Sequence, residues 1–519
     1  MQFSLGFLSR IRPAFLAVIS GAMLALSYPS PSFSILAWIA FVPLLIAIYG
    51  KTPRETFKLG FVAGFSAYVG ILYWLNIVMT TYGKLPLVVS ISLSLLMAAY
   101  LALFVAGSFS LAALASESGI AMPVTLPVFW VSFEFLRAYL LSGFPWALIG
   151  YSQYRTLPLI QLTDITGVYG LSFIILFLNV LVYELWRWVT GSGRTRYPLK
   201  TTIVAASLMS LSLGYGFVRL NSADSGKEVK VALAQGNIPQ DVKWDPSFQE
   251  ETVAIYERLS RKTAGTGTDL VVWPESSLPF FFQKEERYSK RVSLLAKELN
   301  SCLVVSSPAL EYEDGKERLL NSAFLISSDG ASAGRSDKVH LVPFGEYVPM
   351  ARLLPFVKKM VQGIGDFSPG RTTTPLAAPF GRMGVLICFE GIFPEISREY
   401  VRNGAGLLVN ITNDAWFGNS SAPYQHLSMS VFRAVENRVP LVRSANTGIT
   451  AFIDSRGHVY GMTRLFREAL LTGTVRMGSE KTFYTRFGDV FAVGCCVAAL
   501  VVIGFIILRK RRESFCPAE

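Results

Sequence analysis

Three side chains with complementary reactivity lie at the ends of predicted strands in the second half of the sequence. Cys388 ends the run GVLIC, Glu275 comes just after LVVW, and Lys338 begins an extended segment. A thiol attacks as its thiolate, and a neighbouring lysine lowers the pKa of the thiol and stabilises a developing oxyanion. A carboxylate within reach can take the thiol proton and return it to a leaving group. These residues predict a nucleophilic site, with the backbone N–H of Phe389 as a second oxyanion donor.

Each of these residues also has an ordinary structural explanation. Alone, Glu275 reads as a solvated turn residue, Lys338 as a surface charge and Cys388 as a core cysteine. A Cys–His pair is the main competing site, because His340 and His426 lie in the same region. His340 would share a strand face with Lys338, whereas His426 opens a helical pattern in which it is expected to cap or pack. The three histidines have no metal-ligand spacing, so no metal is predicted.

The segments around these residues predict an α/β domain. From Lys227 onward, β-rich runs such as VKVALAQ, LVVWP and GLLVNIT alternate with helical patterns at 247–263, 285–299 and 425–437. Ligands in such folds gather at the carboxyl ends of strands, which is where the three reactive residues fall. We therefore expect residues 221–487 to form the catalytic domain.

The rest of the chain predicts a membrane domain. Half of the 519 residues are hydrophobic, and eight apolar segments are long enough for a bilayer core of about 30 Å. We expect seven spans within residues 1–220, and a last span with a basic tail in 488–519. The eight segments are Pro13–Tyr28, Phe33–Tyr49, Leu59–Met79, Leu85–Ala115, Met122–Leu140, Val168–Trp188, Thr201–Val218 and Val490–Leu508.

The charges of the short loops predict the orientation of these spans. One side carries most of the lysines and arginines, including the run Arg509 to Arg512, and the other side carries few. By the positive-inside rule both termini are cytoplasmic and the domain at 221–487 lies outside. The net charge of +12 is therefore partly a topology signal, and no nucleic-acid partner is predicted. The same alternation of loop charge favours reading the first apolar segment as a membrane span rather than as a cleaved signal peptide.

Cysteine usage sets one further condition. Five cysteines are too few for a disulfide framework, and Cys302 and Cys388 are the two in the external domain. An unpaired Cys388 in an oxidising compartment needs a reason. Whether Cys302 approaches it is left open by the sequence.

The motifs around the three residues carry a resemblance to a known family. VVWPES, DKVHLVPFGEYVP and LICFE resemble the nitrilase (carbon–nitrogen hydrolase) superfamily, over about Val229 to Val475. QGNIPQDVKWDP, NDAWFG, RAVENRVPLVRSANTG, SGFPWALIGYSQY and DITGVYGLSF narrow it to the apolipoprotein N-acyltransferase family, nearly end to end. The resemblance implies a four-layer αββα sandwich beside a multi-span helical membrane domain.

The resemblance also implies roles and partners. Glu275 would be the general base, Lys338 the electrostatic support and Cys388 the nucleophile of a ping-pong acyl transfer. The donor would be a phospholipid, preferably phosphatidylethanolamine, and the acceptor a diacylglyceryl-modified apolipoprotein; no cofactor is required. The chain would lie in the bacterial inner membrane with a periplasmic catalytic domain. Further family positions fall on Glu346, Glu390, Asn321, Trp244 and Trp416.

Two apolar stretches predict how such a site would meet a membrane. One is LPFFFQ, with Phe280 to Phe282, and the other is ARLLPFVKKMVQGIG at 351–365. The second is hypothesised to be a lid whose Leu353 and Phe356 enter the outer leaflet while Lys358 and Lys359 meet phosphates; the alternative is a surface helix of the sandwich.

Two other functions stay open at this point. A membrane-tethered amidase would explain the reactive residues but not the apolar stretches, and a transporter or scaffold would explain the spans but not those residues. Four ionisable residues near span ends receive no role: Glu134, Arg137, Asp164 and Glu184.

Overall fold

The chain divides into two compact units. The computed structural model describes residues 12–192, 196–222, 226–313, 315–348 and 366–515. The first unit comprises Met1–Asn76, Leu87–Leu220 and Asp489–Glu519, and the second comprises Ile77–Pro86 and Asn221–Gly488. The second unit thus includes a ten-residue segment from the N-terminal half, which the sequence did not single out.

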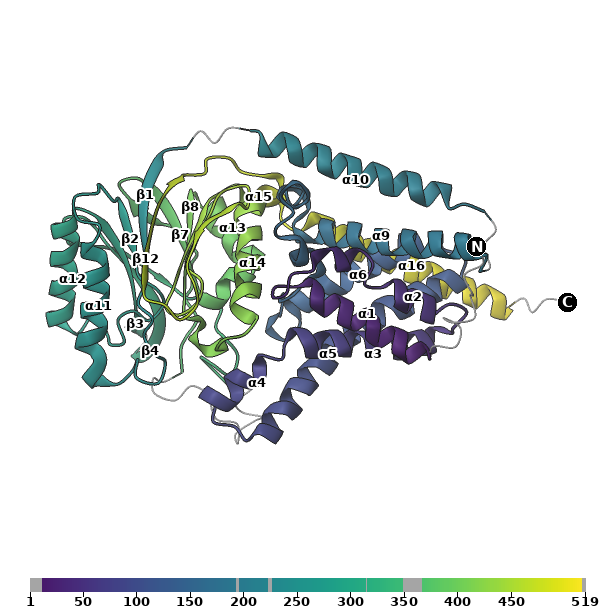
Figure 1. Ribbon diagram of the computed structural model, residues 1–519, viewed down its shortest axis with the longest axis horizontal. Helices are drawn as coiled ribbons and strands as arrows, with labels where there is room; N and C mark the ends of the chain where they lie inside the picture. The colour runs from purple at the N-terminus through teal and green to yellow at the C-terminus, as the bar shows by residue number, and fades with distance from the viewer. Residues whose placement is uncertain (1–11, 193–195, 223–225, 314, 349–365, 516–519) are drawn as a thin grey trace. The chain divides into compact units, whose positions relative to one another are not determined.

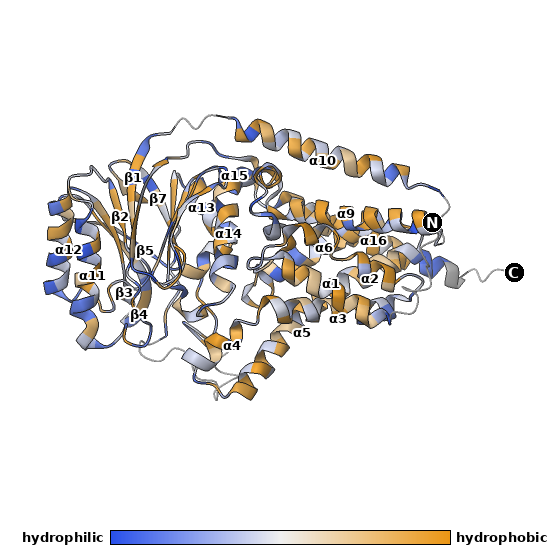
Figure 2. Cartoon of the chain, viewed as in Figure 1, coloured by the Kyte–Doolittle hydropathy of each residue, from blue (hydrophilic) through white to orange (hydrophobic). Residues whose placement is uncertain are grey.

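The first unit is helical and apolar (Figures 1 and 2). Within the described residues, five helices are long and apolar enough to cross a membrane: α5 (Leu87–Glu117), α6 (Met122–Tyr139), α9 (Val168–Thr190), α10 (Leu199–Leu220) and α16 (Val490–Phe515). The bent pair formed by α3 (Pro53–Ile71) and residues 75–82 makes a sixth candidate. The predicted count of eight is not confirmed, because α1 (Pro13–Ser27) and the stretch Ser34–Ala47 are shorter than a full span.

Short elements complete this unit. They are η2 (Ser34–Trp38), α2 (Val42–Ala47), α4 (Leu75–Ile77), η4 (Leu140–Ser142), η5 (Ile149–Gln153), α7 (Leu157–Ile160) and α8 (Thr163–Thr166). η3 (Val78–Tyr82) and Gly83, which follows it, lie in the segment Ile77–Pro86 of the second unit.

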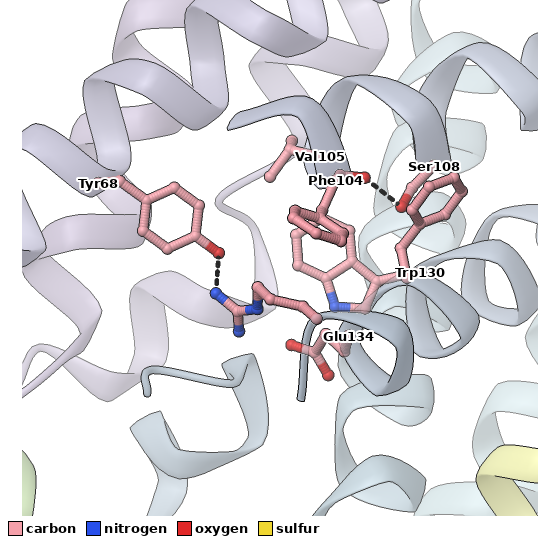
Figure 3. A pocket seen from close by; sticks show the side chains of 8 residues that line it. Tyr68, Phe104, Val105, Ser108, Trp130 and Glu134 are labelled. Carbon is pink, nitrogen blue, oxygen red and sulfur yellow. Dashed lines mark hydrogen bonds between the residues drawn. The ribbon is translucent and has the colours of Figure 1, made fainter. Parts of the chain in front are cut away.

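The ionisable residues left without a role are buried inside the first unit: Glu134, Arg137, Asp164 and Glu184. Glu134 accepts a hydrogen bond from the backbone N–H of Ile149, and Arg137 donates to the Tyr68 hydroxyl and to the carbonyl of Ala147. Tyr68 and Glu134 both face a pocket between α3, α5 and α6 (Figure 3). Because buried polar groups need partners, these bonds hold the loop at 147–149 onto α6.

The second unit is built from two six-stranded sheets (Figure 1). The first has the order β12 (Ala469–Arg476), β1 (Glu228–Gln235), β2 (Leu270–Val272), β3 (Cys302–Glu313), β4 (Lys316–Ile326), β5 (Ser332–Asp337). The second has the order β11 (Val459–Met462), β10 (Ala451–Ile453), β9 (Leu441–Ala445), β8 (Leu407–Thr412), β7 (Gly381–Ile387), β6 (Leu376–Ala378). β1, β2 and β3 run parallel, as do β7, β8 and β9.

Helices cover the outer face of each sheet. α11 (Gln249–Arg261) and α12 (Glu286–Leu299) pack on the first sheet, and α13 (Pro394–Arg402) and α14 (Ala422–Asn437) lie on the second (Figure 1). Short elements η6 (Pro246–Phe248), η7 (Cys388–Ile392), η8 (Asp414–Phe417) and α15 (Phe483–Phe487) connect them.

The strand pattern explains this layering. Along β1, Ala232 and Ala234 join the core under α11 and α12, while Val231 and Leu233 join the core between the sheets. Successive strand residues point to opposite faces, so a strand apolar at every position is covered on both sides. The resulting order, helices, sheet, sheet and helices, confirms the predicted four-layer sandwich.

Candidate active site

The three reactive residues each follow a strand, whereas Lys338 was expected to begin an extended segment. Glu275 lies just past β2, Lys338 immediately past β5 and Cys388 immediately past β7. β5 is antiparallel to β4, which is antiparallel to β3, so β2 and β5 point the same way and end at the same edge of the first sheet. Cys388 reaches this edge from the facing sheet, and the charges of Glu275 and Lys338 act on its thiol.

A buried cluster of two carboxylates, an amide and a lysine lies at this edge. The Lys338 ammonium is 3.6 Å from the Glu275 carboxylate and 3.0 Å from that of Glu346. The Asn321 amide, from β4, donates to Glu275 at 3.0 Å and to Glu346 at 2.9 Å. Of the family positions, Glu346 and Asn321 thus lie in direct contact with the base and the lysine.

These contacts fix the charge of the lysine. Lys338 is 1% exposed, and burial alone would favour its neutral form. Burial lowers its pKa, but Glu346 and Glu275, together with the thiol, outweigh this and raise the pKa well above the usual range. Lys338 is therefore a permanent cation, suited to stabilising an oxyanion.

Cys388 sits on a sharp backbone elbow. Its φ is +54°, a left-handed conformation that costs a side-chain-bearing residue about 1–2 kcal/mol. Its carbonyl accepts hydrogen bonds from the Asn410 amide at 3.4 Å and from Nε2 of His426 at 3.2 Å. Such strain persists where the surroundings enforce it, and here a buried polar network does so.

That network extends behind the elbow. Arg443, from β9, donates to the Oδ1 atom of Asn410, to Asp414 at 2.7 Å and to Nδ1 of His426 at 3.1 Å. The ion pair with Arg443 holds the pKa of Asp414 well below its usual range despite burial, and burial lowers the pKa of His426. The lowered pKa favours the neutral imidazole, whose Nε2 lies against the Cys388 carbonyl and whose Nδ1 lies 3.1 Å from both Asp414 and Arg443.

Lys338 lowers the pKa of the Cys388 thiol, as expected, but the net shift of that pKa is upward, so the expected thiolate is wrong. Burial, reinforced by the charge of Glu275, raises the pKa of Cys388 to about 12, and Lys338 offsets this in part. Cys388 therefore rests as a thiol. Its proton must leave as the sulfur attacks, which requires a base rather than a preformed thiolate.

The structure gives the histidines supporting positions. His426 contacts the backbone carbonyl of Cys388, and it lies within α14 rather than capping it. The His340 ring is 3.8 Å from that of Phe393, and burial, with Lys338, lowers its pKa to about 4. Within the described residues, no group of three or more His, Cys, Asp or Glu side chains could hold a metal ion.

Glu390 joins two of the three strand ends. Its Oε1 accepts from the backbone N–H groups of Val339 at 2.6 Å and His340 at 3.2 Å, and its Oε2 accepts from Ile387 at 2.7 Å. Burial raises its pKa to about 7, against the pull of these donors. Glu390 thus ties the segment after Lys338 to the elbow.

The aromatic candidate residues, which are Phe389 and the family positions Trp244 and Trp416, lie nearer the surface. Phe389 and Trp244 are half-buried. Phe389 is the second residue of η7, so its N–H precedes the first bond of that turn and is available to a ligand. Trp416 is half-buried too. Its ring and that of Tyr82 pack nearly perpendicular with centroids 5.0 Å apart, and the Tyr82 hydroxyl donates to the carbonyl of Ala415.

The two apolar stretches have different outcomes. Phe280 and Phe282 are buried against α12 and β4, where they pack on Tyr288 and Phe324, whereas Phe281 between them is half-buried. The lid segment at 351–365 lies outside the described residues.

Sequence reasoning missed several residues of the site. Asn410, Asp414 and Arg443 support the elbow, and Lys243 donates to the carbonyl of Glu275 at 2.9 Å. The motifs NDAWFG and QGNIPQDVKWDP, which contain Asp414 and Lys243, were the available signal. Cys302 is a free, buried cysteine at the amino end of β3, whereas Glu275 follows the carboxyl end of the adjacent β2.

Comparison with known proteins covers both units. Residues 20–181 match the family model "Apolipoprotein N-acyltransferase N-terminal domain", and residues 230–483 match "Carbon-nitrogen hydrolase". The chain is 59% identical to an apolipoprotein N-acyltransferase of Geobacter metallireducens, over 96% of both chains. It is 30% identical to the enzyme of that name from Pasteurella multocida, again over 96% of both.

A solved structure aligns with part of the chain. Nit3 of Saccharomyces cerevisiae, described as a member of branch 10 of the nitrilase superfamily, covers 49% of this chain and 92% of its own, with 21% identity and a TM-score of 0.38. The sequence identities over nearly the full chain establish the family to which the chain belongs. The chain belongs to the apolipoprotein N-acyltransferase family.

Proposed function

We propose that this protein moves an acyl chain from a membrane phospholipid, preferably phosphatidylethanolamine, to the α-amino group of the diacylglyceryl-cysteine that begins an apolipoprotein. The observation that carries the proposal is the meeting of Glu275, Lys338 and Cys388 at one edge of the sandwich. Family membership over nearly the full chain supports the substrates.

The first half-reaction forms a thioester. Glu275 takes the proton of the Cys388 thiol as the sulfur attacks the ester carbonyl of the phospholipid. The oxyanion is stabilised by the Lys338 ammonium and the N–H of Phe389. When the C–O bond breaks, Glu275 returns the proton to the leaving oxygen and a lysophospholipid departs.

The second half-reaction uses the same groups in reverse. The α-amine of the acceptor attacks the thioester, and Glu275 takes a proton from the nitrogen. The C–S bond breaks, the sulfur recovers the proton and the N-acylated product leaves. No external energy source is needed, because the ester already carries an activated acyl group.

A membrane-embedded enzyme suits these substrates. A soluble enzyme would have to draw acyl chains into water at about 0.8 kcal/mol per CH₂. The loop charges support an inner-membrane location with both termini cytoplasmic and residues 221–487 in the periplasm. The proposal includes the hypothesis that residues 351–365 act as a lid at the membrane.

The test is acyl transfer by the purified full-length protein in detergent. The wild type and the Cys388→Ala variant are each given phosphatidylethanolamine with a labelled acyl chain, together with a synthetic diacylated lipopeptide. In a separate reaction each protein is given a simple soluble amide. We expect the label on the lipopeptide with the wild type alone. Turnover of the amide without lipopeptide labelling would instead identify a tethered amidase, and equal labelling by Cys388→Ala would refute the nucleophile.

A further inference from the structure

A second lysine is buried beside the general base. Lys243 lies in the loop after β1, its side chain is fully buried, and its ammonium donates to the backbone carbonyl of Glu275 at 2.9 Å. Lysine is rarely buried completely, because removing an ammonium from water is costly unless it is paired. A loop lysine could point into solvent, so its position here calls for a role.

Lys243 holds the peptide that follows the general base. The residue after Glu275 is Ser276, with a left-handed φ of +51°. The N–H of Ser276 donates to the Ser306 hydroxyl at 3.0 Å, and the carbonyl of the same peptide accepts from Lys243. Both polar groups of this peptide are therefore fixed by side chains, which sets the direction in which the Glu275 side chain leaves the backbone.

Lys243 also completes the charge balance of the site. The carboxylates of Glu275 and Glu346 face the ammonium of Lys338, which leaves one negative charge in excess before the thiol ionises. Lys243 supplies a second positive charge that acts on Glu275 and on Cys388. With both lysines charged, a negative sulfur or oxyanion forms in a site that is neutral rather than already negative.

This second charge can titrate near neutral pH. Burial lowers the pKa of Lys243 to about 8, although Glu275 and Cys388 oppose the shift. Lys338 is held charged by two carboxylates, so it does not titrate in this range. The other ionisable groups around the site are Glu346, the ion pair of Asp414 with Arg443, and Glu390, whose own pKa is raised to about 7.

We propose that Lys243 is a positioning residue for Glu275 and the second cation that allows Cys388 to react. This inference rests on the proposed function for its biological meaning, but it concerns the reactivity of the thiol itself. Nucleophilic attack by Cys388 thus depends on a lysine in the loop after β1 as well as on the three residues at the strand ends.

The experiment measures alkylation of Cys388 by iodoacetamide in the full-length protein in detergent, between about pH 6.5 and 9.5. Mass spectrometry of the peptide containing Cys388 separates it from the other four cysteines. The variants are Lys243→Met, Lys243→Arg and a matched control, Lys230→Met. Lys230 also donates its ammonium to a backbone carbonyl, that of Thr266, but on the exposed surface.

The proposal expects a distinct result from each protein. At pH 7, Lys243→Met is alkylated about tenfold more slowly, equal to about one unit in the thiol pKa, while Lys243→Arg and Lys230→Met stay within about threefold of the wild type. In the wild type, the logarithm of the rate rises with pH with a slope that falls below one near pH 8, where Lys243 loses its proton. In Lys243→Met the slope stays at one.

Two results would overturn the proposal. One is Lys243→Met reacting at the rate of Lys230→Met, and the other is a wild-type slope of one across the whole range. The wild-type profile needs no variant, so it decides the matter even if Lys243→Met does not fold. Because no phospholipid or lipopeptide takes part, a failure here is distinct from a failure of the acyl-transfer assay.

Discussion

Replacing Glu390 by glutamine should change how the stability of the second unit depends on pH. The Glu390 carboxyl is 1% exposed, and burial raises its pKa from the ordinary value of 4.5 to about 7. Between these two values the folded protein keeps the proton and the unfolded chain loses it. The unfolded chain then binds fewer protons, so the free energy of unfolding falls as the pH rises.

The size of this effect follows from the two pKa values. At about 1.4 kcal/mol per pH unit, the move from 4.5 to about 7 removes about 3 kcal/mol of stability between roughly pH 4.5 and pH 7.5. A glutamine at this position does not titrate, so it lacks this slope. It also loses one acceptor for the N–H of Val339, His340 or Ile387, which lowers stability by a pH-independent amount.

The assay is thermal unfolding of the full-length protein in detergent at several pH values. The wild type should be more stable than Glu390→Gln at pH 4.5, and this difference should shrink by about 3 kcal/mol by pH 7.5. At about 2–4 °C per kcal/mol, that is roughly 6–12 °C in Tm. Other titrating groups are common to both proteins and cancel.

Glu468 provides the control. Its ion pair with Arg258 at the surface lowers the pKa of Glu468. Glu468 therefore stabilises the folded protein above its ordinary pKa, and this stabilisation is lost as the pH falls. Glu468→Gln should therefore give no shrinking difference. A Glu390→Gln difference that stays constant within about 2 °C, or that grows with pH, would refute the reasoning.

Three further substitutions test other contacts of the site. Asn321→Leu should slow acylation of the enzyme about 100-fold, measured by rapid-quench labelling. The carboxylates of Glu275 and Glu346 lose a shared donor, and each such hydrogen bond is worth about 1.5–3 kcal/mol. Lys338→Met should abolish acylation. It should also lower the free energy of unfolding by about 3–5 kcal/mol, because the carboxylates of Glu275 and Glu346 lose their cation. A variant with the Tm of the wild type would contradict this. His426→Phe should slow acylation about tenfold, because it removes a hydrogen-bond donor to the Cys388 carbonyl. His426→Gln, which can still donate, should recover part of the rate. Equal rates for the two variants would argue against that hydrogen bond.

The sequence predicted the location of the reactive residues because the ends of strands can be recognised from the amino-acid pattern. Apolar runs mark β2 and β7, and the residues that follow such runs meet at the edge of the sandwich. The catalytic roles of Glu275, Lys338 and Cys388 stay predictions that the geometry supports.

Other properties depend on packing, which a linear pattern does not contain. The net pKa of the Cys388 thiol is raised because burial and the charge of Glu275 outweigh the lowering by Lys338. Lys243 lies in a loop, where nothing in its spacing distinguishes it from a surface lysine. The packing of Tyr82 on Trp416 joins segments far apart in sequence.

The predicted count of eight spans is not confirmed, for a different reason. Hydropathy registers apolar length, and it does not register helix breaks such as those that divide residues 33–49 and 59–82 into shorter pieces.

The most direct test of the account is the intact mass of the purified protein after exposure to phosphatidylethanolamine, beside Cys388→Ala. The account predicts one fatty-acyl increment on the wild type alone, released by hydroxylamine and discharged by a diacylated lipopeptide. The absence of this increment, or an equal increment on Cys388→Ala, would contradict it.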